Sequence, residues 1–157
     1  VIVNAKVADY FKDHVLQCGL TYSGHTLACA AGVAAVTYYT EHHICDHVKK
    51  MEAILRDFLN RMVEKHVCVG EARCIGLFSA LEIVKDKEKR IPMVSYGVKN
   101  PIMPSIMSEL KNRGFSTFGR ENNINICPPL TITEEELKEY LPVLDDVLTW
   151  VDETYCK

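Results

Sequence analysis

The stretch Cys68–Asp86, CVGEARCIGLFSALEIVKD, decides the fold class because its hydrophobic pattern has a different period from the segments around it. In its second half, Phe78, Ala80 and Glu82 alternate with residues of the opposite face, and a period of two is typical of a strand. Gly76 separates the two halves, as a turn residue does. We therefore predict two strands, one on each side of Gly76.

Two helices are expected before these strands. Residues 27–39, LACAAGVAAVTYY, contain five Ala and one Gly, and side chains of so little bulk let another backbone approach closely. We expect this helix to be buried, and a subunit interface is one location where it could be. Residues 44–65 carry apolar side chains at alternating spacings of four and three. That spacing predicts an amphipathic helix.

The segments after the strands complete the order of elements. Pro104–Arg113 is expected to be a short helix, and Ile124–Cys127 a short strand. Thr133–Glu136 is a capping box that starts an amphipathic helix, which Pro142 is expected to kink or split in two. The order helix, helix, two strands, helix, strand, helix predicts a small α+β domain. Its sheet should be short, mostly antiparallel and covered by helices.

The composition is that of an ordinary soluble globular chain: 157 residues, 48% hydrophobic, 25% charged, net charge −3. No run of like charge indicates a nucleic-acid partner or a membrane surface, and the longest small-apolar run, residues 27–36, is half of what a bilayer requires. The seven cysteines are an odd number without a C-x-x-C pair. This favours reduced thiols and a cytoplasmic protein.

The stretch Gly19–Thr26, GLTYSGHT, has the spacing of a phosphate-binding P-loop, but His25 stands where the lysine belongs. No apolar strand precedes it, so we do not interpret it as a nucleotide site. Thr21, Tyr22 and Ser23 precede the expected helix, where backbone N–H groups and hydroxyls suit an anion. The alternative is that one of these hydroxyls caps the helix and binds nothing.

Two other clusters contain residue types that bind metals or act as nucleophiles. His43 and His47 stand one helical turn apart, a spacing that suits zinc, but the third and fourth ligands are missing, and no metal site is predicted. Three cysteines fall in strand-like segments and are expected to be small buried hydrophobic residues rather than nucleophiles: Cys68, Cys74 and Cys127.

Three segments resemble the class III aminotransferases, pyridoxal 5'-phosphate (PLP) enzymes of fold-type I, in order and spacing. They are GLTYSGHTLACAAGVAAV, VGEARCIGLFSALEIVKD and FGRENNINICPPLTITEEEL. The resemblance covers essentially the whole chain and implies the C-terminal portion of such an enzyme. Residues 1–40 would be the tail end of the large PLP domain with an interface helix, and residues 41–157 the C-terminal small domain. The closest group is the pyruvate-linked ω-aminotransferases, including taurine–pyruvate aminotransferases.

The resemblance also implies roles for single residues. Thr21 would contact the cofactor phosphate of the partner subunit, with Tyr22 and Ser23 in the same cofactor-binding motif. Arg120 would bind a substrate carboxylate or sulfonate, because a guanidinium fork matches such groups. The alternative is an exposed loop arginine without a role. Asn125 stands where another branch of the family has its carboxylate-binding arginine, which counts against the dicarboxylate and ornithine branches.

No catalytic residue is predicted in this chain, because the resemblance places the Schiff-base lysine upstream of it. The full-length protein would be a PLP-dependent homodimer that transfers an amino group from an ω-amino acid or amine to a 2-oxo acid such as pyruvate. The chain alone is expected to be inactive. Two alternatives stay open: a non-catalytic interaction or regulatory domain with the same fold, and a related PLP enzyme such as an aminomutase or decarboxylase.

A structural ion pair is expected between Arg73 and Glu82 on the neighbouring strands.

Overall fold

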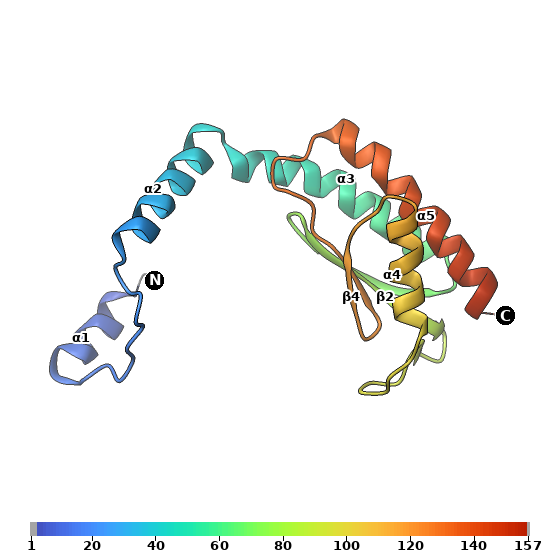
Figure 1. Cartoon of the computed structure of the whole chain (residues 1–157), viewed down its shortest axis with the longest axis horizontal. Coiled ribbons are helices and arrows are strands. Elements are labelled where there is room, and N and C mark those ends of the chain that lie inside the picture. The colour runs from blue at the N-terminus through green and yellow to red at the C-terminus, as the bar shows by residue number, and fades with distance from the viewer. Residues whose placement is uncertain (1–2, 157) are drawn as a thin grey trace. The chain divides into compact units, whose positions relative to one another are not determined.

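A computed structural model describes residues 3–156 of the chain, which divides into two compact units, residues 1–41 and 42–157 (Figure 1). The first unit holds two of the described helices, and the second holds three helices and five strands. Among the described residues, no helix has both the length and the apolar character needed to cross a membrane.

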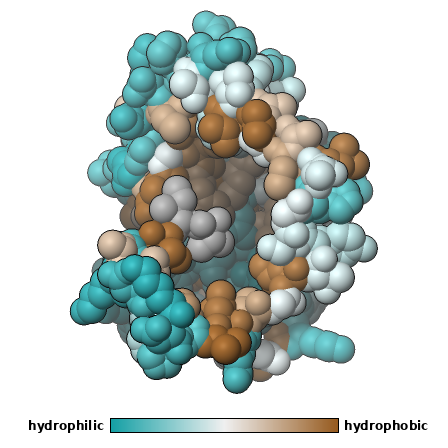
Figure 2. Space-filling view, turned by 90° about the vertical axis from the view of Figure 1, so that its left-hand side faces the viewer, coloured by the Kyte–Doolittle hydropathy of each residue, from teal (hydrophilic) through white to brown (hydrophobic). Residues whose placement is uncertain are grey.

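The first unit consists of α1 (Ala5–Asp13) and α2 (Thr26–Glu41). The side-chain oxygen of Asn4 caps α1 by accepting a hydrogen bond from the N–H of Val7 at 3.0 Å. Every residue of both helices is exposed, so the first unit does not itself bury the small-residue helix as expected. Figure 2 shows hydrophobic side chains in brown at the surface. The exposed large hydrophobic or aromatic residues of α1 and α2 are Val7, Tyr10, Phe11, Leu27, Val33, Val36, Tyr38 and Tyr39.

The second unit begins with α3 (Ile44–Lys65), whose bounds are the predicted ones. The chain continues through β1 (Val69–Ile75), β2 (Phe78–Asp86), β3 (Ile91–Pro92) and α4 (Ile102–Asn112). It ends with β4 (Phe118–Arg120), β5 (Asn123–Ile126) and α5 (Glu134–Tyr155).

The predicted turn at Gly76 joins β1 and β2 as an antiparallel hairpin. Ile75 pairs with Phe78, so Gly76 and Leu77 alone form the loop. Gly76 has φ 58°, and a positive φ at the first loop position is the pattern of a type II′ turn. A Cβ at this position would lie 2.9 Å from Cγ1 of Val48 on α3, so the turn requires glycine for its backbone angle and for its packing.

The strands lie in the order β1-β2-β5-β4, and β3 pairs with the far end of β2. All pairings between them are antiparallel. The predicted α+β class with a short antiparallel sheet is therefore confirmed. Residues 118–120 were not predicted to form a strand, because three residues are too few to show a hydrophobic period. Their pairing with β5 creates β4.

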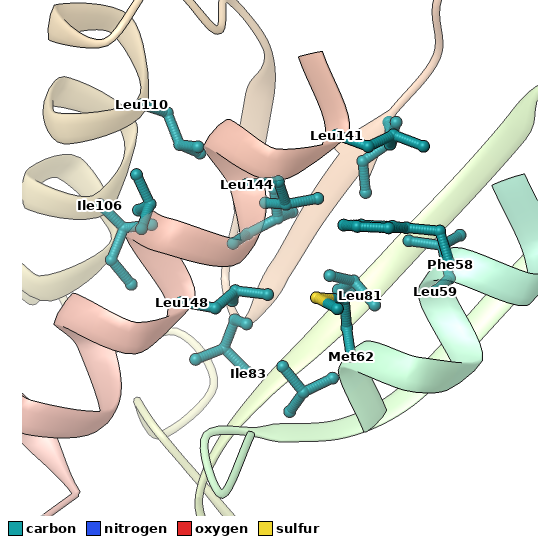
Figure 3. Close-up of a cluster of buried hydrophobic side chains, with 14 of the residues drawn as sticks. Phe58, Leu59, Met62, Leu81, Ile83, Ile106, Leu110, Leu141, Leu144 and Leu148 are labelled. Carbon is teal, nitrogen blue, oxygen red and sulfur yellow. The ribbon is translucent and has the colours of Figure 1, made fainter. Parts of the chain in front are cut away.

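Three helices, α3, α4 and α5, cover one face of the sheet (Figure 1). Side chains from β2 meet those of the helices in the core shown in Figure 3, where Phe58, Leu59, Met62, Leu81, Ile83, Ile106, Leu110, Leu141, Leu144 and Leu148 are labelled. Within the second unit the other face stays open, because Ile75, Phe78 and Phe118 are 81%, 71% and 64% exposed. Antiparallel sheets commonly cover one face only.

The capping box at the start of α5 is present, with the Thr133 hydroxyl accepting from the N–H of Glu136 and the Glu136 carboxylate accepting from the N–H of Thr133. Of the two outcomes expected at Pro142, a kink or a split, the split does not occur, because α5 runs through Pro142 as one helix. Pro142 is exposed. The Lys138 carbonyl, which loses its usual partner at residue 142, therefore lies on the solvent side, and the cost of the missing hydrogen bond is reduced.

The prediction for the strand cysteines holds for two of the three. Cys68 and Cys74 are buried, and burial raises the pKa of both thiols. Cys127 is exposed, so that prediction was wrong. It directly follows the buried Ile126 of β5, and the alternation along the strand puts its side chain on the opposite, open face. All seven cysteines are free thiols.

Candidate functional site

The predicted cofactor-binding residues Thr21, Tyr22 and Ser23 lie in one exposed turn, residues 21–24, just before α2. The N–H groups of Ser23 and His25 donate to the carbonyls three residues earlier, at 2.9 and 3.2 Å, and hold the turn closed. Gly24 has φ 71°, a conformation that glycine adopts without strain. The turn therefore presents two hydroxyls and one aromatic ring at consecutive positions.

The chemistry of this turn fits a phosphate group. Within residues 3–156, the hydroxyls of Thr21 and Ser23 make no hydrogen bond, so neither caps α2. The first N–H of α2 that bonds back along the chain belongs to Cys29, which donates to the carbonyl of His25 at 2.9 Å. The N–H groups before it point out of the helix start, where the helix dipole favours an anion. Free hydroxyls and amides at one helix end are donors that a phosphate can use.

Arg120 is the last residue of β4 and is exposed. It pairs in register with Asn123 of β5, which pairs with Glu82 of β2. Directly opposed residues of an antiparallel sheet carry their side chains on the same face. In the part of the chain that the structure describes, the Arg120 guanidinium has no hydrogen bond and no ion pair. Its five donors are therefore available to a carboxylate or sulfonate.

The predicted ion pair between Arg73 and Glu82 on neighbouring strands is present, and Arg73 has two further partners. Arg73 Nη1 lies 3.5 Å from Oε2 of Glu82 and 3.6 Å from Oε1 of Glu71. Arg73 Nη2 donates to Oδ1 of Asn123 at 2.7 Å, which links β1 to β5 across β2. The sequence analysis did not identify this contact to Asn123, because strand order is decided by the tertiary fold.

A second polar cluster, which the sequence analysis missed, is buried between the end of α3 and α5. The His66 side chain is 2% exposed, with Nδ1 2.7 Å from Oδ2 of Asp152 and Nε2 2.8 Å from Oδ1 of Asp145. Both ring nitrogens of His66 therefore face a carboxylate oxygen of α5. Lys65 Nζ contacts Asp145 at 2.6 Å, and the N–H of Cys68 donates to Asp152 at 2.8 Å. Asp145 and Asp152 are seven residues apart, about two helical turns, so the sequence places both carboxylates on one face of a helix. This spacing was the sequence signal from which the cluster could have been predicted.

The histidines weighed as metal ligands have other surroundings. His43 precedes α3 with φ 49°, and Nε2 of His47 lies 2.8 Å from the carbonyl oxygen of Ile132. Among residues 3–156, no group of three or more His, Cys, Asp or Glu side chains is arranged to hold a metal ion.

The chain belongs to the class III aminotransferases, since the family model described as Aminotransferase class-III matches residues 1–148. PLP is the cofactor of this family, and the fold is that of a domain of fold-type I PLP aminotransferases. These matches confirm the resemblance drawn from the three sequence segments.

A solved structure of taurine:2-oxoglutarate aminotransferase from Bifidobacterium kashiwanohense, in complex with PLP and glutamate, is 70% identical with a TM-score of 0.91. The match covers 97% of this chain and 34% of that one. Ethanolamine-phosphate phospho-lyase homolog 1 of Caenorhabditis elegans is 31% identical over 82% of this chain and 27% of its own length. Gamma-aminobutyrate transaminase 1 of Oryza sativa subsp. indica is 30% identical over 86% and 25%. The chain thus spans between a quarter and about a third of the length of these relatives.

Proposed function

We propose that this chain is the C-terminal portion of a PLP-dependent transaminase that moves an amino group from an ω-amino acid or amine to a 2-oxo acid. Residues 1–40 would end the large PLP domain and supply an interface helix, and residues 41–157 would form the small domain. Family membership over residues 1–148 supports the reaction class. The 70% identity to a taurine:2-oxoglutarate aminotransferase supports taurine as the donor, and 2-oxoglutarate ahead of pyruvate as the acceptor, against the expectation drawn from Asn125.

The turn at residues 21–24 would hold the cofactor phosphate. PLP, when bound, carries the amino group between donor and acceptor. The Thr21 and Ser23 hydroxyls and the amides at the start of α2 would donate hydrogen bonds to the phosphate, with Tyr22 beside them. In a homodimer, this turn would serve the active site of the partner subunit. What supports the assignment is that both hydroxyls have no other partner in the described residues.

Arg120 would bind the acidic group of the substrate, and its uncommitted guanidinium is the observation that carries this proposal. A sulfonate or carboxylate presents two oxygens to the guanidinium fork, so the substrate would be oriented as well as bound. No residue of this chain would act as proton carrier at the reacting carbon. We therefore propose that the chain alone does not transaminate, and that the enzyme works in the cytoplasm, where seven free thiols stay reduced.

The test is transamination by the full-length enzyme, with taurine, β-alanine, 4-aminobutyrate and the neutral donor 1-phenylethylamine, against 2-oxoglutarate and pyruvate. Arg120→Met should raise KM for taurine about 10-fold or more, since charge-assisted hydrogen bonds are worth about 1.5–3 kcal/mol. KM for 1-phenylethylamine should change little. An equal loss for both donors would refute the role of Arg120, and no transfer from any donor would refute the reaction class.

A second candidate is a PLP-dependent lyase reaction on an amino-alkyl phosphate. The 31% identity to an ethanolamine-phosphate phospho-lyase homolog favours it, and the same anion-binding residues would serve a phosphate group. Release of inorganic phosphate from ethanolamine phosphate, without a 2-oxo acid present, would identify this reaction. Strict dependence of turnover on a 2-oxo acid would exclude it in favour of transamination.

A further inference from the structure

A row of polar side chains crosses the open face of the sheet and ends at Arg120. The residues in register are Glu71 on β1, Glu82 on β2, Asn123 on β5 and Arg120 on β4. Neighbouring strands lie about 4.8 Å apart, so Asn123 is the acceptor directly beside Arg120, and Glu82 is one strand further away. Asn123 is one strand spacing away and within reach of the Arg120 side chain, and Glu82, at about 9.6 Å between strand backbones, is reached when the two long side chains extend toward each other. Asn123 and Glu82 are therefore hydrogen-bond acceptors of the same chain that lie near Arg120.

Arg73 engages all of these acceptors. Its guanidinium lies 2.7 Å from Asn123 Oδ1, 3.5 Å from Glu82 Oε2 and 3.6 Å from Glu71 Oε1. Glu71 and Glu82 are directly opposed, and like charges in that arrangement repel each other unless a cation lies between them. Arg73 supplies that cation. Arg120, at the end of the same row, makes no hydrogen bond or ion pair in the described residues.

We infer that Arg73 is a positioning residue for the anionic substrate: it occupies the acceptors of the row and thereby leaves the Arg120 guanidinium available. This inference rests on the proposed role of Arg120 in binding the acidic group of the substrate. Without Arg73, the Glu82 carboxylate and the Asn123 oxygen lose their donor, and two opposed carboxylates remain without a cation. Arg120 is the nearest cation of the row. Its pairing with Glu82 would then compete directly with substrate binding.

The expected loss of anion affinity on replacing Arg73 follows from the exposure of the side chains in the row. Arg73 and Glu82 side chains are 51% and 36% exposed, so water screens their interaction. Exposed ion pairs change an equilibrium by a factor of about 1.4 to 5. Arg73→Met should therefore weaken binding of an anionic ligand by about two- to fivefold, well below the loss expected from Arg120→Met.

The experiment uses the full-length enzyme and two readouts. Calorimetry measures the Kd of glutarate, a dicarboxylate without an amino or oxo group, and steady-state kinetics with taurine separates KM from kcat. The variants are Arg73→Met, Arg73→Met with Glu82→Gln, and Arg120→Met. Arg61→Met is the matched control, because it removes one exposed arginine from α3, outside the sheet, where its ion pair is with Asp57. We expect Arg73→Met to raise the glutarate Kd and the taurine KM by about two- to fivefold, with the change in KM rather than kcat.

The double variant distinguishes the inference from a simple loss of folding. A variant that fails to fold does not regain glutarate binding when Glu82 is also replaced. Neutralising Glu82 removes the charged competitor and leaves Asn123 as a neutral acceptor, so Glu82→Gln should restore most of the glutarate binding that Arg73→Met loses. If Arg73→Met leaves the Kd unchanged while Arg120→Met raises it, the inference is wrong and the proposed role of Arg120 stands. If Arg120→Met also changes nothing, the proposed role itself is wrong. A loss of kcat that Glu82→Gln does not restore would assign Arg73 a purely structural role and overturn the inference.

Discussion

The His66 cluster offers the most direct test of how the second unit is held together. His66→Leu replaces a buried ring by a side chain of comparable bulk and removes the donor shared by Asp145 and Asp152. Two charge-assisted hydrogen bonds, at 2.8 and 2.7 Å, are lost, and each is worth about 1.5–3 kcal/mol. If nothing replaced them, the free energy of unfolding would fall by about 3–6 kcal/mol.

Two contacts reduce this cost. Asp145 keeps Lys65 at 2.6 Å, and Asp152 keeps the N–H of Cys68 at 2.8 Å. The two carboxylates are 25% and 21% exposed, so water reaches them in part. We therefore expect a loss of about 2–4 kcal/mol at pH 7, below the figure of about 3–5 for breaking a fully buried pair. For a chain of this length, that corresponds to a drop in Tm of about 4–16 °C.

The pH dependence follows from the aspartates. Burial pushes the pKa of Asp145 upward, but hydrogen bonds from Lys65 and His66 outweigh it and hold the pKa below its ordinary value of 3.8. A lowered pKa stabilises the fold above the unfolded-state pKa, and this stabilisation is lost as the pH falls through the folded-state pKa. Stability of the wild type should therefore fall below about pH 4, and the difference between wild type and His66→Leu should narrow there.

The assay is urea unfolding of the 157-residue chain, followed by the fluorescence of Trp150. This is the only tryptophan, and it lies on α5 between Asp145 and Asp152. Lys65→Met is the matched control, because its ammonium is exposed and should contribute less than about 1 kcal/mol. A loss below about 1 kcal/mol for His66→Leu at pH 7, or a difference that stays constant into acid, would refute the reasoning.

Three further changes test other parts of the fold by the same unfolding assay. Gly76→Ala should cost about 1–3 kcal/mol, because φ is 58° and the added Cβ meets Val48 at 2.9 Å; a neutral result would contradict the turn geometry. Thr133→Ala should cost about 1 kcal/mol by removing the cap of α5, whereas Thr131→Ala, outside the cap, should cost little. Glu121→Gly should stabilise by about 0.5–1 kcal/mol, because a non-glycine residue there has φ 54°; destabilisation would show that its contact to the N–H of Gly97 outweighs the strain.

Residues with a strong local signal were predicted well. The periodic stripe of residues 44–65 gives α3 with the predicted bounds, because six or more apolar residues at helical spacing leave one way to bury them. The capping box at Thr133 and the turn at Gly76 were also predicted, since each depends on the chemistry of a few adjacent residues. β4 was not predicted, and the local sequence left open whether Pro142 splits α5, because pairing and packing from other segments decide both.

The sequence by itself determined the family, the α+β class, the hairpin at Gly76 and the identity of the candidate anion-binding residues Thr21, Ser23 and Arg120. These depend on residue type and on spacing along the chain. Only the tertiary structure decided which residues become neighbours. The order β1-β2-β5-β4 brings Arg73 to Asn123, and the packing of α5 on α3 encloses His66 between two aspartates. Such contacts join residues about 50 to 86 positions apart, and no local pattern in a single sequence specifies them.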